Sequence, residues 1–311
     1  MTAQVLQGAP VAAKLREKLT PEIQSFRKEH GIAPTLAVVR VGDPPAAISY
    51  SHSIDLAFTE CEMGFQMEAL PEQATTQELV SRLEGLARSD DVHGILLQRP
   101  LPRTLDMRAV MAAFPVFKDV EGATPYHLGN MAQDTGDYLL ASTPSAAIEI
   151  LKHYGIPIEG KRAVVVGRSN ILGKPMAFLL LRENATVAIC HTKTSDLAAV
   201  TREAELLVAA AGRAKLITAD MVSPGTVVID FGVNSVEGRL VGDVDFDVVK
   251  EIAGAITPVP GGTGPVTTVM LMRNTLLAAQ RQIKQSGNKG RIRWLPILKP
   301  PRPRAPKPSQ R

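Results

Sequence analysis

The sequence predicts an α/β protein of two domains, each built on a parallel or mostly parallel sheet. Its 311 residues are enough for two hydrophobic cores. Short apolar segments that fit buried strands alternate with longer segments of helical periodicity along most of the chain. Between Lys161 and Thr194, a strand, a glycine-rich turn, a helix and a second strand follow one another, which indicates a βαβ unit.

Three strands with intervening helices are expected in the first part of the chain. Apolar residues recur at helical spacing over residues 9–30, and Gly31 closes that pattern. Strands are expected at Thr35–Val41, Phe65–Ala69 and Val92–Gln98, with helices over residues 46–63 and 75–89 between them. This alternation favours a layered α/β domain, and a connecting helix over residues 144–154 leads into the second domain.

The βαβ unit offers a site for an anion. Its first strand, Ala163–Val166, is a short apolar run of the kind buried on both faces of a parallel sheet, and it ends at Gly167. The turn ends at Gly173, and Pro175 fits the first turn of a helix that includes residues 176–181. Free N–H groups at the start of that helix attract a phosphate. The spacing differs from GxGxxG, so on the pattern alone an ordinary turn of an α/β domain is the alternative.

The end of the second strand favours NADP over NAD as the cofactor. This strand, Ala185–Cys190, is followed by His191, Thr192 and Lys193, with no acidic residue among them. Units that prefer NAD usually carry Asp or Glu there to bind the ribose 2′-OH, whereas a 2′-phosphate needs positive or neutral donors. Arg168 adds a positive charge in the first turn, so NADP is expected.

The second domain continues the alternation and ends in a long helix. Strands are expected at Glu205–Ala210 and Thr226–Asp230, and Gly212 marks a turn. The segment Pro258–Pro265 carries three glycines in four positions, which allows the main chain to approach a ligand closely. A final helix over residues 266–284 is expected to pack back on the first domain.

Composition excludes several classes of protein. Hydrophobic residues make up 45% of the chain and charged residues 21%, as in soluble globular proteins. No apolar run reaches the ~18 residues that a membrane span needs, and no signal-peptide pattern is present, so a cytoplasmic protein is expected. Cys61 and Cys190 make no disulfide framework and are expected to be apolar fillers, and the sequence shows no metal-ligand spacing.

The C-terminal segment differs from the rest in composition. Residues 289–311 carry eight Lys or Arg and no acid, so the net charge of +4 becomes −4 without them. Its prolines prevent a regular helix, and residues 286–311 are expected to form a basic, disordered or polyproline-like tail. A solvated tail is favoured over a segment that binds nucleic acid or a partner protein.

Six motifs together resemble the methylenetetrahydrofolate dehydrogenase/cyclohydrolase family, over about residues 5–285. They are VVRVGDPPA (38–46), GILLQRPLP (94–102), KDVEG (118–122), VVVGRSNILGKP (164–175), ITPVPGGTGPVT (256–267) and MLMRNT (270–275). The resemblance implies a folate-binding domain, a Rossmann-like NADP-binding domain, a deep cleft between them and a homodimer. It also implies oxidation of 5,10-methylenetetrahydrofolate by hydride transfer, followed in most members by hydrolysis of the methenyl product.

Matching the family motifs position by position gives candidate sites and domain bounds. The candidate catalytic residues are Tyr50, Gln98 and Glu121. Substrate contacts are expected at Tyr50, Ser53, Ile54, Gln98, Pro100, Leu101, Glu121 and Pro265. Cofactor contacts are expected at Gly167, Arg168, Ser169, Ile171, Gly173, His191, Thr192, Ala211, Gly212, Val233, Gly262, Gly264, Pro265 and Thr267. The folate-binding domain is expected at residues 1–140 with the returning helix 267–285, and the NADP-binding domain at residues 141–266.

The substrate side departs from the family pattern at residues close to the chemistry. Members carry a tyrosine followed four residues later by a lysine, two positions that share one face of a helix. Tyr50 is present, but the lysine position is Ile54, and no lysine lies between Val41 and Pro71. Because isoleucine has no hydrogen-bonding group or charge, the cyclohydrolase step is expected to be lost or very weak. Glu121 stands where the family has the aspartate that holds the pterin.

Three functions are compatible with this pattern. The first is an NADP-dependent methylenetetrahydrofolate dehydrogenase without the hydrolase half. The second is an NADP-dependent oxidoreductase of another C–N substrate in a specialised pathway, with Glu121, Ser53 and His52 as new contacts. The third is a non-catalytic folate- or NADP-binding regulator, which the intact cofactor motifs disfavour. His52 and Asp55 are three residues apart and are candidates for a new acid–base pair, although a surface histidine and a solvated aspartate are the simpler interpretation.

Overall fold

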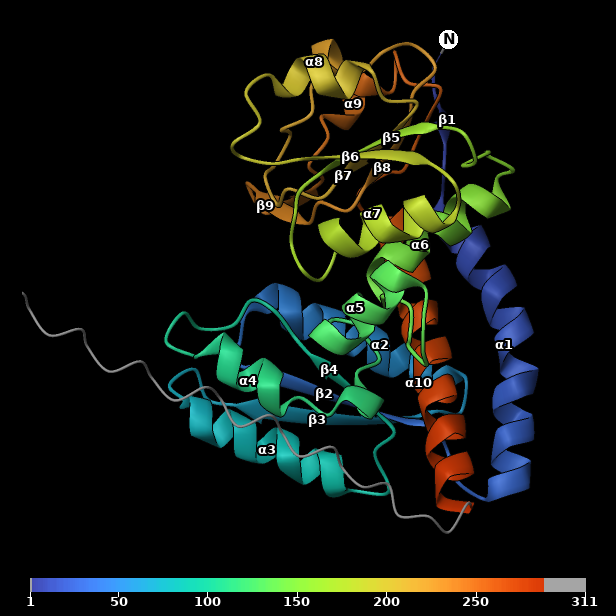
Figure 1. The fold of residues 1–311 in the computed structure, drawn as a ribbon, viewed down its shortest axis with the longest axis vertical. Helices are drawn as coiled ribbons and strands as arrows, with labels where there is room; N and C mark the ends of the chain where they lie inside the picture. Colours follow the sequence, from blue (N-terminus) through green and yellow to red (C-terminus); the bar gives the residue numbers. More distant parts are fainter. Residues whose placement is uncertain (1, 288–311) are drawn as a thin grey trace, which may run out of the picture.

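The computed structural model describes residues 2–287 and shows two α/β domains joined by long helices (Figure 1). The smaller sheet lies in the lower half of the view in Figure 1 and the larger sheet in the upper half. This arrangement confirms the two-domain α/β class predicted from the alternation of elements. Met1 and residues 288–311 lie outside the described residues, and with them nearly all of the predicted basic tail.

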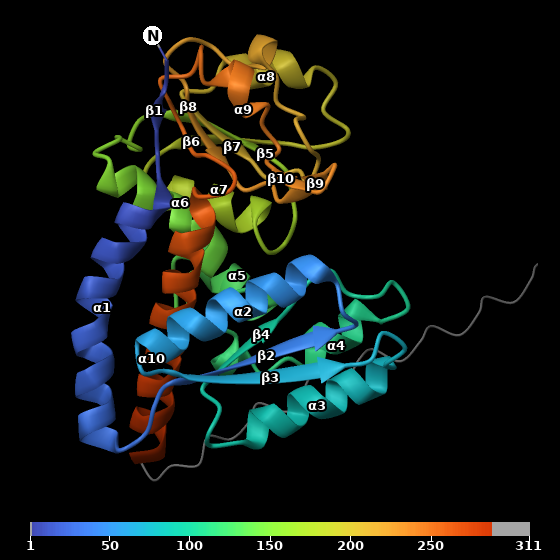
Figure 2. The same ribbon diagram turned by 180° about the vertical axis from the view of Figure 1, so that it is seen from behind.

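The smaller domain is built on three parallel strands in the order β3-β2-β4. These are β2 (Thr35–Val41), β3 (Gly64–Leu70) and β4 (Gly94–Leu97). Helix α2 (Pro45–Glu60) covers one face, and α3 (Thr76–Arg88) and α4 (Met107–Ala113) cover the other (Figure 2). Successive residues of a strand point to opposite faces. Leu36 and Val38 therefore enter the core under α2, whereas Ala37 and Val39 enter the core against α3.

Six parallel strands form the larger sheet, in the order β1-β11-β8-β7-β5-β6. They are β1 (Gln4–Val5), β5 (Arg162–Val166), β6 (Thr186–Cys190), β7 (Leu206–Ala209), β8 (Val227–Asp230) and β11 (Ala255–Ile256). Helices α6 (Ser142–His153) and α7 (Gly173–Arg182) pack on one face, and α8 (Leu197–Arg202) and α9 (Phe246–Val249) lie over the other. Strands β6 and β7 lie on opposite sides of β5, so the strand order reverses there. Open α/β sheets bind ligands at the carboxyl ends of the strands at such a reversal.

Two long helices connect the domains. Helix α10 (Thr263–Gly287) starts in the larger domain, packs against α6 and α1 (Gly8–His30), and runs along the smaller domain as far as β4 and α2 (Figure 1). The expectation that the last helix packs back on the first domain is therefore confirmed, and the helix begins three residues earlier than predicted. Pro175 lies in the first turn of α7, as its missing N–H predicts.

Several short elements carried no signal strong enough to predict from sequence. These are α5 (Pro125–Gln133), the turns of 3-10 helix η1 (Val116–Lys118) and η2 (Ala219–Met221), and the antiparallel pair β9 (Asn234–Val236) and β10 (Arg239–Val241). They are too short to show a clear hydrophobic period. Strand β1 also differs from expectation, because it pairs with β11 in the larger sheet while its residues were assigned to the first domain. Its partner is some 250 residues away, so no local pattern marks the pairing.

Candidate active site

One part of the site lies where α2 faces the end of β4. Tyr50 is half-buried on α2, and Gln98 is buried directly after β4. The Gln98 amide nitrogen donates to the carbonyl of Ala47 (2.8 Å), and the Ser51 hydroxyl donates to the Gln98 amide oxygen (3.2 Å). These two bonds fix the orientation of the amide and tie it to α2. The structure therefore brings the helix that carries Tyr50 against Gln98.

Ile54 lies one helical turn after Tyr50. Its side chain is 0% exposed and packs in the apolar core that includes Phe58 and residues of α10. A substrate contact was expected at Ile54. The side chain has no exposed surface to offer a substrate, because the apolar core covers it. Since no lysine or arginine occurs from Gly42 to Leu70, α2 supplies no cation of this kind to the site.

Two buried polar side chains hold the segment that presents Glu121. The Lys118 ammonium donates to the carbonyls of Leu86 (2.9 Å) and Ser89 (2.6 Å) at the end of α3. The Asp119 carboxylate accepts hydrogen bonds from the main-chain N–H groups four and five residues later, at 3.2 and 2.7 Å. A main-chain bridge between Asp119 and β4 completes the anchoring. Glu121 is therefore carried on a braced segment beside the end of β4.

Burial and neighbouring charges shift the pKa values of two candidate residues. Burial and the charge on Asp119 raise the pKa of Glu121 to about 7, and the positive charge of Arg99 opposes that rise. Burial and the charge on Glu121 raise the pKa of Tyr50 well above its ordinary value. Glu121 is therefore near enough to interact electrostatically with both Tyr50 and Arg99. At neutral pH Tyr50 stays a neutral hydrogen-bond donor, whereas Glu121 is close to its midpoint.

The glycine-rich turn lies where the strand order reverses. Gly167 has φ +131°, and a Cβ at this position would collide with the carbonyl oxygen of Ala210, just after β7. A Cβ on Gly173 would collide with the carbonyl oxygen of Gly167. Only glycine fits these two positions, so no side chain covers the main chain at Gly167 and Gly173. A dinucleotide needs this close approach to its pyrophosphate.

The start of α7 offers an anion the positive end of its helix dipole. Its first N–H groups are not free as the sequence suggested. The Ser169 hydroxyl oxygen accepts from the N–H groups of Leu172 (3.2 Å) and Gly173 (3.4 Å), the Ser169 carbonyl accepts from Lys174 (3.1 Å), and Pro175 has no N–H. The helix has ten residues and no acidic residue in its first turn. Its positive end therefore points into the space beside the turn. These features fit a phosphate-bearing cofactor.

The end of β6 lies beside that turn. A main-chain hydrogen bond of 2.9 Å joins the start of the turn to Cys190, the last residue of β6. Arg168 and Thr192 are exposed near this junction, and His191 is half-buried. The first acid after β6 is Asp196, whose carboxylate caps α8 by accepting from a main-chain N–H. The residues at this end of β6 thus favour a 2′-phosphate over a free 2′-hydroxyl.

Two buried aspartates that the sequence analysis did not select organise the loop after β7. Asp243 is 0% exposed, and its carboxylate accepts from the N–H groups of Ala211, Gly212 and Arg213 at 2.6 to 2.9 Å. The carboxylate of Asp230 in turn accepts from the N–H of Asp243 at 3.0 Å. Ala211 and Gly212 were expected to contact the cofactor, yet their N–H groups are already bonded to Asp243. Both residues are exposed, but their main-chain N–H groups are not free to bind a cofactor.

The remaining candidates on the cofactor side differ in exposure. Gly264 and Pro265 are exposed at the start of α10, and Val233 is 68% exposed. Gly262 and Thr267 are buried, and the Thr267 hydroxyl donates to the carbonyl of Thr263 one turn earlier. The first three have surface available to a ligand. Thr267 mainly stabilises the start of its own helix.

A pocket of about 640 Å³ lies between the two domains. One wall is formed by α4 and by the segments that follow β4 and precede α5. The opposite wall is formed by Ser169, Asn170 and Ile171 of the glycine-rich turn. The predicted cleft is therefore present, and the substrate-side segments face the cofactor turn across it.

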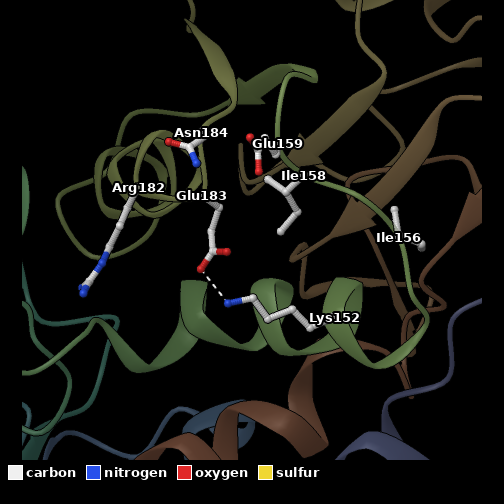
Figure 3. A pocket seen from close by; sticks show the side chains of 7 residues that line it. All are labelled: Lys152, Ile156, Ile158, Glu159, Arg182, Glu183 and Asn184. Carbon is white, nitrogen blue, oxygen red and sulfur yellow. Dashed lines mark hydrogen bonds and ion pairs between the residues drawn. The ribbon is translucent and has the colours of Figure 1, made fainter.

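A second hollow lies away from these residues. It has a volume of about 290 Å³ and is lined by residues that precede β5 and β6, with Lys152 and Glu183 joined by an ion pair of 2.6 Å (Figure 3). This is the amino-terminal edge of the larger sheet. Because dinucleotides bind at the carboxyl-terminal edge, we do not assign the cofactor to it.

Comparison with known proteins agrees with this geometry. Residues 6–121 match the catalytic domain described as tetrahydrofolate dehydrogenase/cyclohydrolase, and residues 141–283 match the NAD(P)-binding domain of the same family. The chain belongs to the tetrahydrofolate dehydrogenase/cyclohydrolase family. The larger domain is thus an NAD(P)-binding domain, and the smaller one is the family's catalytic domain.

Relatives and solved structures of this family cover nearly the whole described chain. A bifunctional protein FolD of Roseiflexus sp. (strain RS-1) is 49% identical over 284 residues, which are 91% of this chain and 98% of the relative. The bifunctional FolD of Campylobacter jejuni is 42% identical with a TM-score of 0.85, covering 90% of this chain and 99% of that one. The Trypanosoma brucei FolD, solved with NADP and an inhibitor, is 34% identical with a TM-score of 0.86, covering 91% and 99%.

A different serine of α2 from the one predicted contacts the candidate site. Ser53 is exposed, and its hydroxyl donates back to the carbonyl of Ser49 in the same helix (3.0 Å). The buried Ser51 instead contacts Gln98. Helical periodicity places residues 47, 51 and 54 on the buried face, and this signal could have selected Ser51.

The proposed His52–Asp55 pair is not formed among the described residues. His52 is exposed, and no hydrogen bond or ion pair joins it to Asp55, whose carboxylate accepts from Thr59 (3.4 Å). Pro100 is exposed and Leu101 half-buried after β4, on the segment that carries Gln98. Cys61 and Cys190 are both buried and free.

Neither a metal cluster nor a membrane span is found in residues 2–287. That part of the chain contains no group of three or more His, Cys, Asp or Glu side chains arranged to hold a metal ion. None of its helices is both long enough and apolar enough to cross a membrane.

Proposed function

We propose that this family member oxidises 5,10-methylenetetrahydrofolate to 5,10-methenyltetrahydrofolate with NADP, and that its cyclohydrolase step is lost or very weak. The observation that carries the proposal is the contrast at the cleft. The glycine-rich turn and the end of β6 fit NADP, while Ile54 puts a buried hydrocarbon where the family resemblance implies a lysine.

Hydride transfer depends mainly on placing the two reacting carbons against each other. NADP supplies the hydride acceptor when bound beside the glycine-rich turn. Tyr50 and Gln98 orient the folate from α2 and β4, and Glu121 holds the pterin from its braced segment. The lone pair of the folate nitrogen supplies the electrons that expel the hydride, so no side chain has to exchange a proton in this step.

Hydrolysis of the methenyl product makes a different demand. A water must be activated, and the nitrogen that leaves must be managed, which requires a group that moves or holds a proton. Ile54 cannot do so. Tyr50 is a weak base candidate because its raised pKa keeps the phenol neutral. Gln98 is held by two hydrogen bonds and has no titratable proton. Glu121 does titrate at about pH 7, but in this proposal its carboxylate is engaged with the pterin. The dehydrogenase half can thus persist where the hydrolase half fails.

NADP is the proposed cofactor because of the charges near β6. Arg168 is exposed beside the end of that strand, and the first acid there, Asp196, is used as a helix cap. The family neighbour from Trypanosoma brucei was solved with NADP, which supports the same choice. The homodimer implied by the family resemblance stays a prediction.

Two assays on the purified full chain test this proposal. The first follows the absorbance of reduced nicotinamide with 5,10-methylenetetrahydrofolate and either NADP or NAD. The second follows loss of 5,10-methenyltetrahydrofolate with and without protein. We expect reduction of NADP in preference to NAD, and hydrolysis no faster than the spontaneous reaction. Hydrolysis well above the spontaneous rate would show that the cyclohydrolase persists without a lysine at position 54. Bound NADP without reduction would point to another C–N substrate.

A further inference from the structure

A groove on the smaller domain shares no residue with the cleft or with the proposed chemistry. It has a volume of about 690 Å³ and is lined by residues of β3, α3 and the turn between them. Strand β3 lies at the edge of its sheet, and among residues 2–287 it pairs only with β2 (Figure 2). Helix α3 packs against β2 and β4 and leaves this side of β3 partly open. Native proteins commonly cover such an edge with a helix or a loop.

The groove combines an apolar floor with open space beside its helix. The floor is formed by half-buried or buried side chains, namely Leu70, Ala74 and Leu86. Gly85 of α3 also lines the groove, and no atom lies within 4 Å of the place where a Cβ would stand. The two acids that line the groove are already engaged, because Glu68 pairs with Arg82 (3.3 Å) and Glu78 caps α3. The floor therefore offers mainly apolar contact.

The surroundings of the groove are negatively charged. Residues 64–91, which form β3, α3 and the turns beside them, carry six Asp or Glu and two Arg. Glu72 and Asp90 are exposed at the two ends of the groove, each directly after a lining residue. Within residues 2–287 neither of these two carboxylates makes an ion pair. A basic segment is attracted to such a face.

Helix α10 brings the chain close to one end of the groove. The Gln282 amide nitrogen donates to the carbonyl of His93 (2.8 Å), which lies four residues after Ser89 at the end of the groove. Gly287, the last residue of α10, is about 8 Å further along the helix. The following residues, 288–311, can span about 80 Å when extended, whereas α3 is about 20 Å long. The chain after α10 is therefore long enough to enter the groove and follow it.

Residues 291–298, RIRWLPIL, have the composition that the groove requires. Five of these eight residues are Ile, Leu or Trp, and Trp294 is the only tryptophan of the chain. Arg291 and Arg293 precede most of the apolar residues. Residues 299–311 contain no Ile, Leu, Val, Phe or Trp. Burial of apolar side chains stabilises a packed state, so residues 291–298 are the part of this segment that gains from a docking surface.

We propose that residues 291–298 dock in the groove between β3 and α3 of the same molecule. The apolar side chains of the segment cover the floor, and its two arginines lie near Asp90 at the end where the chain enters. The segment thereby covers the open edge of β3. Composition alone favours a solvated tail, whereas the groove gives its apolar part a place to pack. The inference does not depend on the proposed dehydrogenase activity.

Trp294 reports on the docking, because it supplies the only tryptophan fluorescence of the chain. The full chain is compared with a synthetic peptide of residues 288–311 by emission wavelength and by quenching with acrylamide. We expect the full chain to emit to the blue of the peptide and to be quenched less, because docking shields the indole from water. Emission and quenching equal to those of the peptide would overturn the proposal. A blue shift that disappears on dilution would also overturn it, because the segment would then bind a second copy.

Gly85→Arg tests whether the contact is made in this groove. The new side chain fills the groove and adds a positive charge, and arginine is a better helix former than glycine. We therefore expect a folded variant in which Trp294 has the emission and quenching of the free peptide. Gly85→Ala is the matched control, because it adds only a methyl group and should keep the wild-type signal. A wild-type signal in Gly85→Arg would place Trp294 elsewhere and reject the groove.

A second pair of variants leaves residues 2–287 unchanged. The double variant Arg291→Glu and Arg293→Glu puts acids against an acidic face and should release Trp294. Its control, Arg302→Glu with Arg304→Glu, makes the same change in charge beyond the docked residues and should keep the wild-type signal. Release of Trp294 by both pairs would assign the contact to the overall charge of the segment. That result, or release by neither pair, would overturn the proposed placement.

Discussion

On the cofactor side of the cleft, main-chain atoms define the site, whereas on the substrate side the site consists of individual side chains. The glycine-rich turn is set by close contacts of Gly167 and Gly173 with neighbouring carbonyls, and the loop after β7 is set by Asp243. The proposed substrate side combines Tyr50 and Gln98, which are carried by different elements. A main-chain site tolerates many side-chain changes, but a side-chain site changes chemistry with one substitution.

The Ile54→Lys variant is expected to have the largest effect, and it tests whether one side chain changes the chemistry of the substrate side. A lysine one turn after Tyr50 can supply the missing proton-handling group, so we expect methenyl hydrolysis to rise about 100-fold, as general acid–base catalysis typically contributes. Because the position is 0% exposed, the variant should also lose about 2 to 4 kcal/mol of unfolding free energy. Hydrolysis is measured on protein shown to be folded by circular dichroism.

Ile54→Met is the matched control, because it keeps an apolar side chain of similar size and adds no charge. It should retain the dehydrogenase and gain no hydrolysis. A folded Ile54→Lys variant with no gain would mean that further substrate-side residues limit the step.

Gly167→Ala is expected to disturb the glycine-rich turn on the cofactor side of the cleft. The new methyl group meets the carbonyl of Ala210 at a backbone angle that alanine rarely adopts, so a loss of about 3 kcal/mol in stability is expected. NADP binding, followed by fluorescence titration, should weaken at least about tenfold, which corresponds to 1.4 kcal/mol. Gly160→Ala is the control, because Gly160 also has positive φ but no atom within 4 Å of the added carbon. If Gly167→Ala and Gly160→Ala weakened NADP binding equally, the weakening would be explained by backbone strain alone.

Asp243→Asn tests the buried carboxylate behind the cofactor loop. The amide nitrogen would face main-chain N–H groups that now donate to the carboxylate, and we expect KM for NADP to rise about tenfold through misplacement of residues 211–213. KM for the folate should change much less. Asp245→Asn, two residues later, removes a partly exposed ion pair with Lys215 and should leave both KM values within about twofold. A folate KM that rises as much as the NADP KM would indicate general unfolding of the domain.

The pH dependence of kcat/KM tests the role of Glu121 on the substrate side. If ionised Glu121 holds the pterin, kcat/KM for the folate should rise through about pH 7 and fall about tenfold per pH unit below it. The raised pKa means that the folded protein binds this proton more tightly than the unfolded chain. The stability contributed by the group is therefore largest below pH 4.5 and is lost as the pH rises to about 7. Glu121→Gln should flatten both profiles, and an unchanged midpoint in that variant would assign the titration to another group.

The smallest expected effect distinguishes the two serines of α2. Ser51→Ala removes the hydroxyl that donates to Gln98, and we expect kcat/KM to fall about three- to fivefold, in line with one neutral hydrogen bond. Ser53→Ala removes an exposed hydroxyl that bonds to its own helix and should change kcat/KM by less than about twofold. A larger fall in kcat/KM for Ser53→Ala than for Ser51→Ala would support Ser53 as the substrate contact.

Patterns within the sequence were enough to predict the fold class, most strands and the glycine-rich turn. These features have local causes: apolar periodicity marks strands and helices, and glycine and proline mark turns. The sequence also shows that position 54 has no charge. Elements of two to four residues, such as β1, β9 and α9, were not predicted because they are too short to show a hydrophobic period.

Which side chains meet could be seen only after the elements were packed together. The choice of Ser51 over Ser53, the bonds from Asp243 to the loop after β7, and the position of Arg99 beside Glu121 all depend on contacts between different elements. Such contacts follow from how sheets and helices pack, and no spacing along the chain encodes them. A backbone turn can therefore be predicted from its own residues, whereas a site made of side chains becomes visible only when the elements that carry them are brought together.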